Sequence, residues 1–224
     1  MTKRFTLYLI GLFIMTIGIG VSIKADLGVS PVSSVPYTIT LIAGIEMGKA
    51  TILFHIALVL LQVIILRKEF ELKQLAQVPV GVLFGYFTTF SNYLTGLLPS
   101  PEHLAFQLLF LLISIIIVAI GLFLYIPADM IPLAGEGAML AISRKTGISF
   151  PKVKIGFDVT VVLISGVVCL SVMHRFGSVG SGTVLAAVLV GVVLTFISRR
   201  FNERYCSFLE GVEMKVGAAE FEEE

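Results

Sequence analysis

The fold is decided by a short polar stretch, Ile23-Lys24-Ala25-Asp26-Leu27-Gly28-Val29-Ser30-Pro31, which ends the first long apolar run. A second stretch, Ile126-Pro127-Ala128-Asp129-Met130-Ile131-Pro132, ends another apolar run in the same way. In both stretches Pro or Gly residues break a helix just after an Asp, and a new short helix is expected to follow. Unwound backbone at membrane depth is tolerated only where protein buries it or where it lines a watery cavity. The two stretches therefore predict two broken helices inside a membrane protein.

The composition of the whole chain agrees with a membrane location. Of 224 residues, 57% are hydrophobic and 14% are charged, whereas about a quarter of the residues of soluble proteins are charged. A helix needs about 20 residues to cross a bilayer core of ~30 Å. Six apolar runs are near or above that length: Phe5–Ile23, Ala50–Leu66, Gln77–Leu97, Leu104–Ile126, Ile155–Met173 and Thr183–Ser198. We therefore expect an all-α membrane protein with six transmembrane helices, and a soluble enzyme or a nucleic-acid binder is excluded.

Two further stretches, Ser30–Ile45 and Pro132–Lys145, are too short to span and are predicted to be re-entrant. The Lys and Arg residues test this topology, because they concentrate on the cytoplasmic side. Six spans with both termini inside place 13 of them inside and 3 outside, whereas eight spans give 11 and 5. The first run follows Lys3 and Arg4 as a signal peptide would, but it lacks a small-x-small cleavage site and is predicted to be retained. The expected location is the cytoplasmic (inner) membrane, as a multi-pass protein.

The chain contains an internal repeat. An offset of 103 residues aligns Ile17–Leu66 with Ile120–Cys169 without a gap and gives 13 identities in 50 positions. Matched Asp, Lys and Gly residues are harder to explain by chance than matched Leu, Ile or Val. Each half has three spans and one short helix, and an odd number of crossings starts the second half on the opposite side. The sequence thus predicts an inverted repeat, an architecture of transporters that bind solutes between their halves.

The predicted organisation is a single transmembrane domain, residues 1–200, followed by an acidic cytoplasmic tail, residues 201–224. The repeat halves comprise residues of about 5–98 and 104–200. Since the chain has no Trp, anchoring at the membrane interfaces is assigned to Phe and Tyr residues, including Tyr8, Tyr37, Tyr93 and Tyr125.

The helix starts after the two breaks are the expected solute site, because free N–H groups there suit an anion or a carboxylate. Asp26 and Asp129 are predicted to flank one central cavity, and the alternative is that they only cap the short helices. Glu136, between two glycines, is expected to face the cavity or to pair with Lys24. The substrate-binding candidates are Asp26, Ser30, Ser33, Asp129, Glu136, Gly182 and Thr183.

His55 and Asp158 occupy equivalent positions of the repeat, one turn or so into a spanning helix. An ionisable residue inside a span is costly, and proton relay is a usual role for it. We therefore assign Asp158 and His55 to proton coupling. The alternative is that both side chains lie at headgroup depth and reach the membrane surface.

Other chemistry is not expected. The Gly-rich segment Gly177–Thr183 lacks the Lys and the preceding strand of a phosphate-binding loop. Histidines are scattered, Ser residues have no evident base, and Cys169 and Cys206 are too few for a zinc site. We expect no enzyme activity, no metal and no cofactor; the expected partners are a small solute and the lipid bilayer, with a homodimer left open.

Two motifs carry a family resemblance. The stretch from Gly18 to Pro31, and Gly180-Ser181-Gly182-Thr183-Val184 with Gly191, resemble signatures of the YczE/YyaS/YitT family of small bacterial membrane proteins. Val32 stands where that family often has an aromatic residue. The resemblance implies a largely uncharacterised family that is presumed to transport solutes.

The leading hypothesis is a secondary transporter or facilitator of a small polar solute. One alternative is the substrate-binding membrane subunit of an energy-coupling-factor importer, which needs a partner ATPase. Another is a membrane regulator that transports nothing.

Overall fold

The computed structural model describes residues 2–209, which form helices and connecting loops without a β-strand. The all-α prediction is therefore confirmed for this part of the chain. Most of the predicted acidic tail, residues 210–224, lies outside the described residues. The elements in order are α1 (Thr2–Ala25), α2 (Pro31–Ala43), α3 (Met47–Leu66), η1 (Arg67–Glu69), η2 (Leu72–Ala76), α4 (Gln77–Gly96), α5 (Leu104–Tyr125), η3 (Ile126–Ala128), α6 (Ala134–Thr146), α7 (Phe150–Met173) and α8 (Ser181–Leu209).

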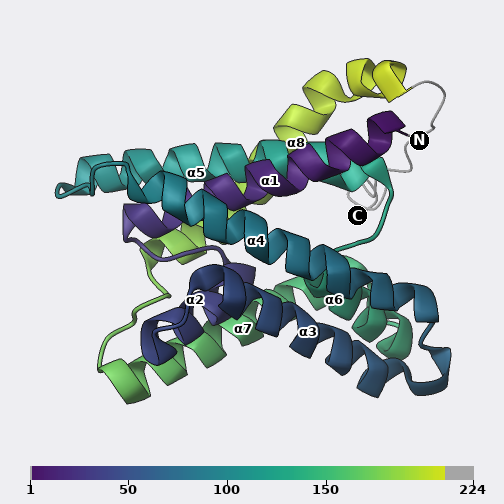
Figure 1. The fold of residues 1–224 in the computed structure, drawn as a ribbon, viewed down its shortest axis with the longest axis horizontal. Coiled ribbons are helices and arrows are strands. Elements are labelled where there is room, and N and C mark those ends of the chain that lie inside the picture. The colour runs from purple at the N-terminus through teal and green to yellow at the C-terminus, as the bar shows by residue number, and fades with distance from the viewer. Residues whose placement is uncertain (1, 210–224) are drawn as a thin grey trace.

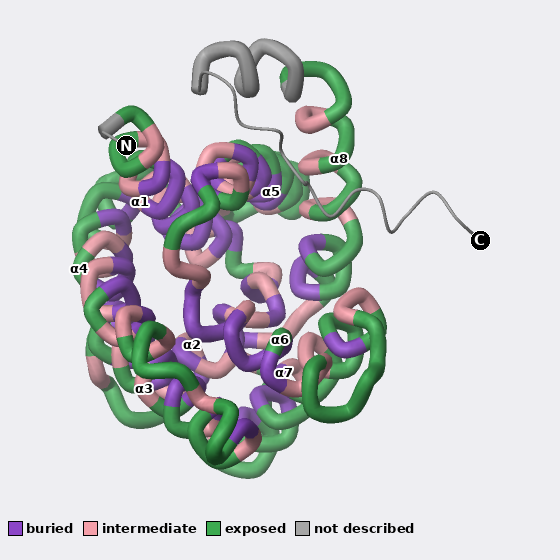
Figure 2. The backbone as a smooth tube through the Cα atoms, turned by 90° about the vertical axis from the view of Figure 1, so that its right-hand side faces the viewer, coloured by how far each residue is buried: buried purple, intermediate pink, exposed green. Residues whose placement is uncertain are grey.

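Long helices surround two short ones. Helices α1, α3, α4, α5, α7 and α8 have 20 residues or more and lie roughly along one direction (Figure 1). Viewed along that direction, they enclose α2 and α6 (Figure 2). Each short helix has 13 residues and is about 20 Å long, which is less than the ~30 Å of a bilayer core. Neither short helix is long enough to cross.

Five helices are long and apolar enough to span a membrane: α1, α3, α5, α7 and α8, within the residues that the structure describes. The sixth predicted span corresponds to α4, which is 20 residues long but is not among the five. Its second half is polar, with Thr88, Ser91, Asn92 and Thr95 on consecutive turns. These side chains make α4 less apolar than the other long helices.

The helix boundaries of the second half follow those of the first at the offset of 103 residues. Helix α2 begins at Pro31 and α6 at Ala134, while α3 begins at Met47 and α7 at Phe150. The backbone repeats as well: Gly44 and Gly147 end the short helices in the left-handed conformation, with φ of 67° and 71°. Asp26 and Asp129 also have positive φ, 54° and 49°, although neither is a glycine. The correspondence thus extends to backbone conformations that L-residues rarely adopt.

The halves differ in how their last two helices pack. Helices α3 and α4 meet at glycines: a β-carbon on Gly85 would lie 2.7 Å from the carbonyl oxygen of Gly48, and one on Gly81 would lie 2.8 Å from His55. The counterparts of Gly48, Gly81 and Gly85 are Pro151, Val184 and Val188, and the two valines are 66% and 60% exposed. The first half therefore has a tight two-helix seam that the second half lacks.

Candidate functional site

The first break, residues 26–30, is held by the Gly-rich loop that precedes α8. The N–H of Gly182 donates to the Leu27 carbonyl oxygen at 2.7 Å, and the N–H of Val29 donates to the Ser178 carbonyl oxygen at 3.2 Å. Gly28 has φ of 96°, and a β-carbon there would lie 2.5 Å from the Thr183 hydroxyl. The loop thus satisfies backbone groups that the break leaves without helical partners.

Gly182 and Thr183 were expected to line a cavity, and the structure shows what they contact. Thr183 is 1% exposed, and its hydroxyl accepts a hydrogen bond from the N–H of Gly180 at 3.2 Å. Gly182 lies against Leu27, since a β-carbon on it would come within 2.7 Å of the Leu27 carbonyl oxygen. Both residues therefore pack on the first break and position it.

The second break, residues 129–133, is held by tyrosine side chains. The Tyr8 hydroxyl donates to the Ile131 carbonyl oxygen at 2.7 Å, and the N–H of Leu133 donates to the Tyr125 hydroxyl at 2.6 Å. The Tyr125 hydroxyl in turn donates to the carboxylate of Glu136 at 2.6 Å. A chain of hydrogen bonds therefore links the unwound backbone to an acid in the first turn of α6.

The sequence did not predict this role for Tyr8 and Tyr125. They were assigned to the membrane interface, but they are only 3% and 4% exposed, and their ring centroids lie 5.4 Å apart. That assignment is wrong for these two residues, because both side chains turn inward to the broken backbone. The signal was present in part: Tyr125 lies four residues before Asp129, within reach of the break.

Each short helix begins against the long helix of the other half. The Ser165 hydroxyl of α7 donates to the Ser34 hydroxyl of α2 at 3.0 Å. Gln62 of α3 donates from Nε2 to the Ala134 carbonyl oxygen of α6 at 3.2 Å and to Gln77 Oε1 at 2.8 Å. Gln62 and Ser165 are equivalent residues at the offset of 103, so the halves exchange matching contacts at the starts of α2 and α6.

Hydroxyl groups line the start of α2. The Ser30 hydroxyl donates to the Ser33 hydroxyl at 3.0 Å, and Ser33 is 7% exposed. A buried hydroxyl pair of this kind can accept and donate hydrogen bonds to a polar solute. Ser30 and Ser33 therefore stay in the candidate site, at one helix start, with Glu136 at the other.

Asp26 and Asp129 do not meet at one cavity. Asp26 follows the end of α1 and Asp129 follows η3, at the end of α5, and both residues are exposed. Helices α1 and α5 lie side by side and run in opposite directions (Figure 1), so their ends lie apart. The expectation that the two carboxylates flank a common cavity does not hold.

Glu136 is half-buried beside Tyr125. It does not pair with Lys24, whose amine donates to the Ser100 hydroxyl at 3.0 Å.

His55 and Asp158 have different surroundings. His55 is 4% exposed, its ring stacks on Phe84 with centroids 5.5 Å apart, and its Nδ1 atom has no hydrogen-bond partner. Asp158 binds Lys154 at 2.6 Å through one oxygen, while the other oxygen is buried without a partner. His55 is therefore enclosed by protein, and Asp158 is tied to a cation one turn away.

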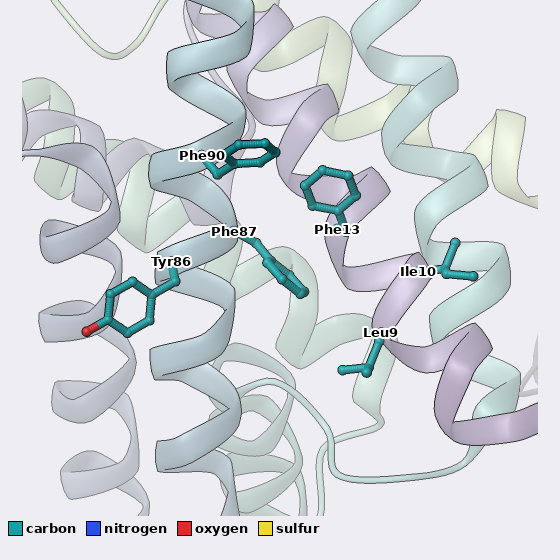
Figure 3. A pocket seen from close by; sticks show the side chains of 6 residues that line it. All are labelled: Leu9, Ile10, Phe13, Tyr86, Phe87 and Phe90. Atoms are coloured by element: carbon teal, nitrogen blue, oxygen red, sulfur yellow. The ribbon is translucent and has the colours of Figure 1, made fainter. Parts of the chain in front are cut away.

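The structure also has an open apolar groove of about 410 Å³ between α1 and α4. Figure 3 shows the side chains along it, which are Leu9, Ile10, Phe13, Tyr86, Phe87 and Phe90. Almost no polar surface lines this groove, so it suits hydrocarbon and does not suit a polar solute.

Among the described residues no cluster of three His, Cys, Asp or Glu side chains could hold a metal ion.

Comparisons with known proteins agree with the family resemblance. The model of a family of unknown function, DUF6198, matches residues 2–199. The uncharacterized membrane protein YczE of Bacillus subtilis is 25% identical over 194 residues, which cover 86% of this chain and 84% of that protein. An uncharacterized protein of Haemophilus influenzae is 27% identical over 194 residues, covering 87% and 83%. No solved structure matches the chain. The resemblance to the YczE-containing family is therefore confirmed.

Proposed function

The chain belongs to the family of unknown function DUF6198, and from that premise we propose that it is a secondary transporter or facilitator of a small polar solute in the cytoplasmic membrane. The observation that carries the proposal is the matched pair of short helices. Both begin after a break with a positive-φ Asp, both have 13 residues, and each begins against the other half. Broken helices that meet between two repeats are the usual place for a solute site in transporters.

The proposed topology has six crossings in two inverted halves. Helix α4 is the sixth crossing, since it has the length of a span and connects the η2 end of the fold with the start of α5. The offset of 103 residues in helix boundaries supports a repeat, and the antiparallel course of α1 and α5 supports its inversion. In this arrangement α2 enters from one side of the membrane and α6 from the other.

The solute site lies between the starts of α2 and α6. Ser30 and Ser33 supply hydroxyl groups on one side, and Glu136 supplies a carboxylate on the other. The free N–H groups of two helix starts add hydrogen-bond donors without a net charge. Asp26 and Asp129, exposed at opposite ends of the α1 and α5 pair, mark the two approaches to this site.

Proton coupling is assigned to Asp158, with His55 as its counterpart in the other half. Each has a buried atom without a hydrogen-bond partner, so this atom is free to take up a proton. Asp158 also binds Lys154, whose ammonium group compensates the charge of the carboxylate when no proton is bound to it. A proton-coupled carrier needs a titratable group that is exposed alternately to the two sides of the membrane.

The test is transport by the purified protein alone in liposomes. A panel of radiolabelled amino acids, amines and sugars is offered with and without a pH gradient, and protein-free liposomes serve as the control. Accumulation of at least one solute only in the protein-containing liposomes supports the proposal. If no solute enters while circular dichroism shows an intact helical protein, the transporter assignment fails. That outcome is expected if the protein is a subunit that needs a partner ATPase, or if it is a regulator that transports nothing.

A further inference from the structure

The connection between α3 and α4 carries an excess of positive charge. The turns η1 and η2 lead from the end of α3 to the start of α4, at one end of the long helices (Figure 1). This connection has three cations and two acids, and the end of α6 adds two cations. We call the cations the basic surface: Arg67, Lys68, Lys73, Arg144 and Lys145. All of them, and both acids, are exposed.

Contacts bring the two segments of the basic surface together. The Lys145 amine of α6 lies 2.9 Å from the carboxylate of Glu69, 76 residues away in the sequence. The pKa of the Glu71 carboxyl lies below its usual value, first because the Lys73 amine binds it at 2.6 Å and further because of the charge of Arg144. The end of α6 therefore lies beside the α3–α4 connection.

The other cations of the basic surface have no acid bound to them. Arg67, Lys68 and Arg144 form no salt bridge within the part of the chain that the structure describes. A phosphate group suits such cations, because Arg binds it through two parallel N–H donors and Lys binds it as a point charge. The basic surface thus has unused positive charge for an anion.

The repeat shows that the fold does not need these charges. Helix α2 ends at Gly44 in the same left-handed conformation as α6 does at Gly147, yet its last turn has no cation. Lys and Arg concentrate on one side of a membrane, but that tendency does not require two distant segments to bring them to one place. The counterparts of the five cations at the offset of 103 are all uncharged: Leu170, Ser171, Phe176, Leu41 and Ile42.

Two leucines of η2 lie beside the basic surface. Leu72 is 81% exposed, the highest value for a large apolar side chain in the described residues, and Leu75 is 45% exposed. Side chains three residues apart lie on the same face of a 3-10 helix, so the two leucines point the same way. Because α3 is long and apolar enough to span a membrane, η2 lies at the level of the lipid headgroups. Exposed leucines at that depth contact acyl chains.

We propose that the basic surface binds the headgroup of an anionic phospholipid, with Leu72 and Leu75 among its acyl chains. Clusters of about four to eight Lys and Arg residues next to a membrane-spanning helix are typical of such sites. The proposal goes beyond the proposed transport function and does not depend on it, because lipid binding is measured without a solute.

The experiment measures thermal unfolding of the purified full-length protein in detergent micelles by circular dichroism, because the chain has no Trp to report by fluorescence. One sample receives phosphatidylglycerol, a second receives phosphatidylcholine with the same acyl chains, and a third receives glycerol 3-phosphate, which has the phosphate but no acyl chain. A ligand that binds only the folded state raises the midpoint. We expect phosphatidylglycerol to raise it several degrees above the other two.

Variants decide whether the basic surface carries the effect. Lys68→Gln combined with Arg144→Gln removes two unpaired cations and should abolish most of the extra rise; Arg67 is kept, because its φ of 49° makes the backbone there sensitive to substitution. Lys49→Gln combined with Arg175→Gln removes the same charge beside the opposite ends of α3 and α7 and should respond like the wild type.

A second variant tests the apolar part and leaves every charge in place. Leu72→Gln combined with Leu75→Gln should also weaken the response to phosphatidylglycerol, and it decides the matter if the cation variant does not fold. The proposal is overturned if phosphatidylcholine or glycerol 3-phosphate raises the wild-type midpoint as much as phosphatidylglycerol does. It is also overturned if the folded variants respond to phosphatidylglycerol as strongly as the wild type.

Discussion

Gly11 of α1 and Gly121 of α5 meet backbone to backbone: a β-carbon on either residue would lie 2.8 Å from the carbonyl oxygen of the other. A second contact joins Gly18 to Ser114, where a β-carbon on Gly18 would lie 3.0 Å from the Ser114 carbonyl oxygen. At the offset of 103, Ser114 is the counterpart of Gly11, and Gly121 is the counterpart of Gly18. Each contact is thus the image of the other, as in the self-complementary contacts of a two-fold axis. This reciprocity is what an inverted repeat requires at its centre.

The first prediction concerns this helix contact. Gly121→Ala should destabilise the protein by about 1–3 kcal/mol, because the new β-carbon would lie 2.7 Å from the Met15 backbone nitrogen and the helices would have to separate. Gly156→Ala is the matched control, since nothing lies within 4 Å of its β-position and Ala favours a helix over Gly by about 0.5–1 kcal/mol. Unfolding midpoints in one detergent should therefore fall for Gly121→Ala and stay or rise for Gly156→Ala. Equal shifts for both variants would contradict the packing.

The second prediction concerns topology. In a background without Cys169 and Cys206, a cysteine at Lys49 should react with a membrane-impermeant maleimide from outside the cell, and one at Lys152 only after permeabilisation. Lys49 and Lys152 are equivalent residues just after the two short helices, and inversion places them on opposite sides. Labelling of both from the same side would exclude the inverted repeat.

The third prediction concerns coupling. Asp158→Asn should abolish solute accumulation driven by a pH gradient and preserve solute exchange, because the amide can still form hydrogen bonds but cannot take up a proton. Glu102→Gln, an exposed acid with the same change of charge, should transport like the wild type. Uphill accumulation by Asp158→Asn would remove Asp158 from the coupling step. A wild type that ignores the gradient would remove proton coupling altogether.

The fourth prediction concerns the positive φ of Asp129. Asn tolerates the left-handed conformation, so the free energy of unfolding of Asp129→Asn should lie within about 0.5 kcal/mol of the wild-type value. Asp129→Val should cost about 1–3 kcal/mol, because a β-branched residue is strained at a φ of 49°. The same pair of substitutions at Asp26, with φ of 54°, should behave alike. Denaturation curves of the four variants check this, and a Val variant as stable as its Asn partner would contradict the backbone conformation.

The sequence predicted the features that depend on local pattern. The apolar runs gave the helices, and Pro, Gly and the repeated Ala-Asp pair gave two breaks at the offset that the structure shows. It did not predict which side chains hold the breaks. Tyr8 contacts Ile131, 123 residues away, and Gln62 contacts Ala134 across the two halves. Periodicity indicates that a polar residue lies in a span, but the packing of distant helices decides which partner it meets.

The glycine seam between α3 and α4 has a consequence for the rigidity of the two halves. Helices α3 and α4 are fixed to one another by backbone contacts, whereas Val184 and Val188 of α8 face outward. Helix α8 packs mainly on α5 and leaves these two valines uncovered, so the second half is open at the place where the glycine contacts close the first half. The two segments that correspond at the offset of 103 residues are therefore unequal in rigidity: α3 and α4 are tied to one another by backbone contacts, and α7 and α8 are not.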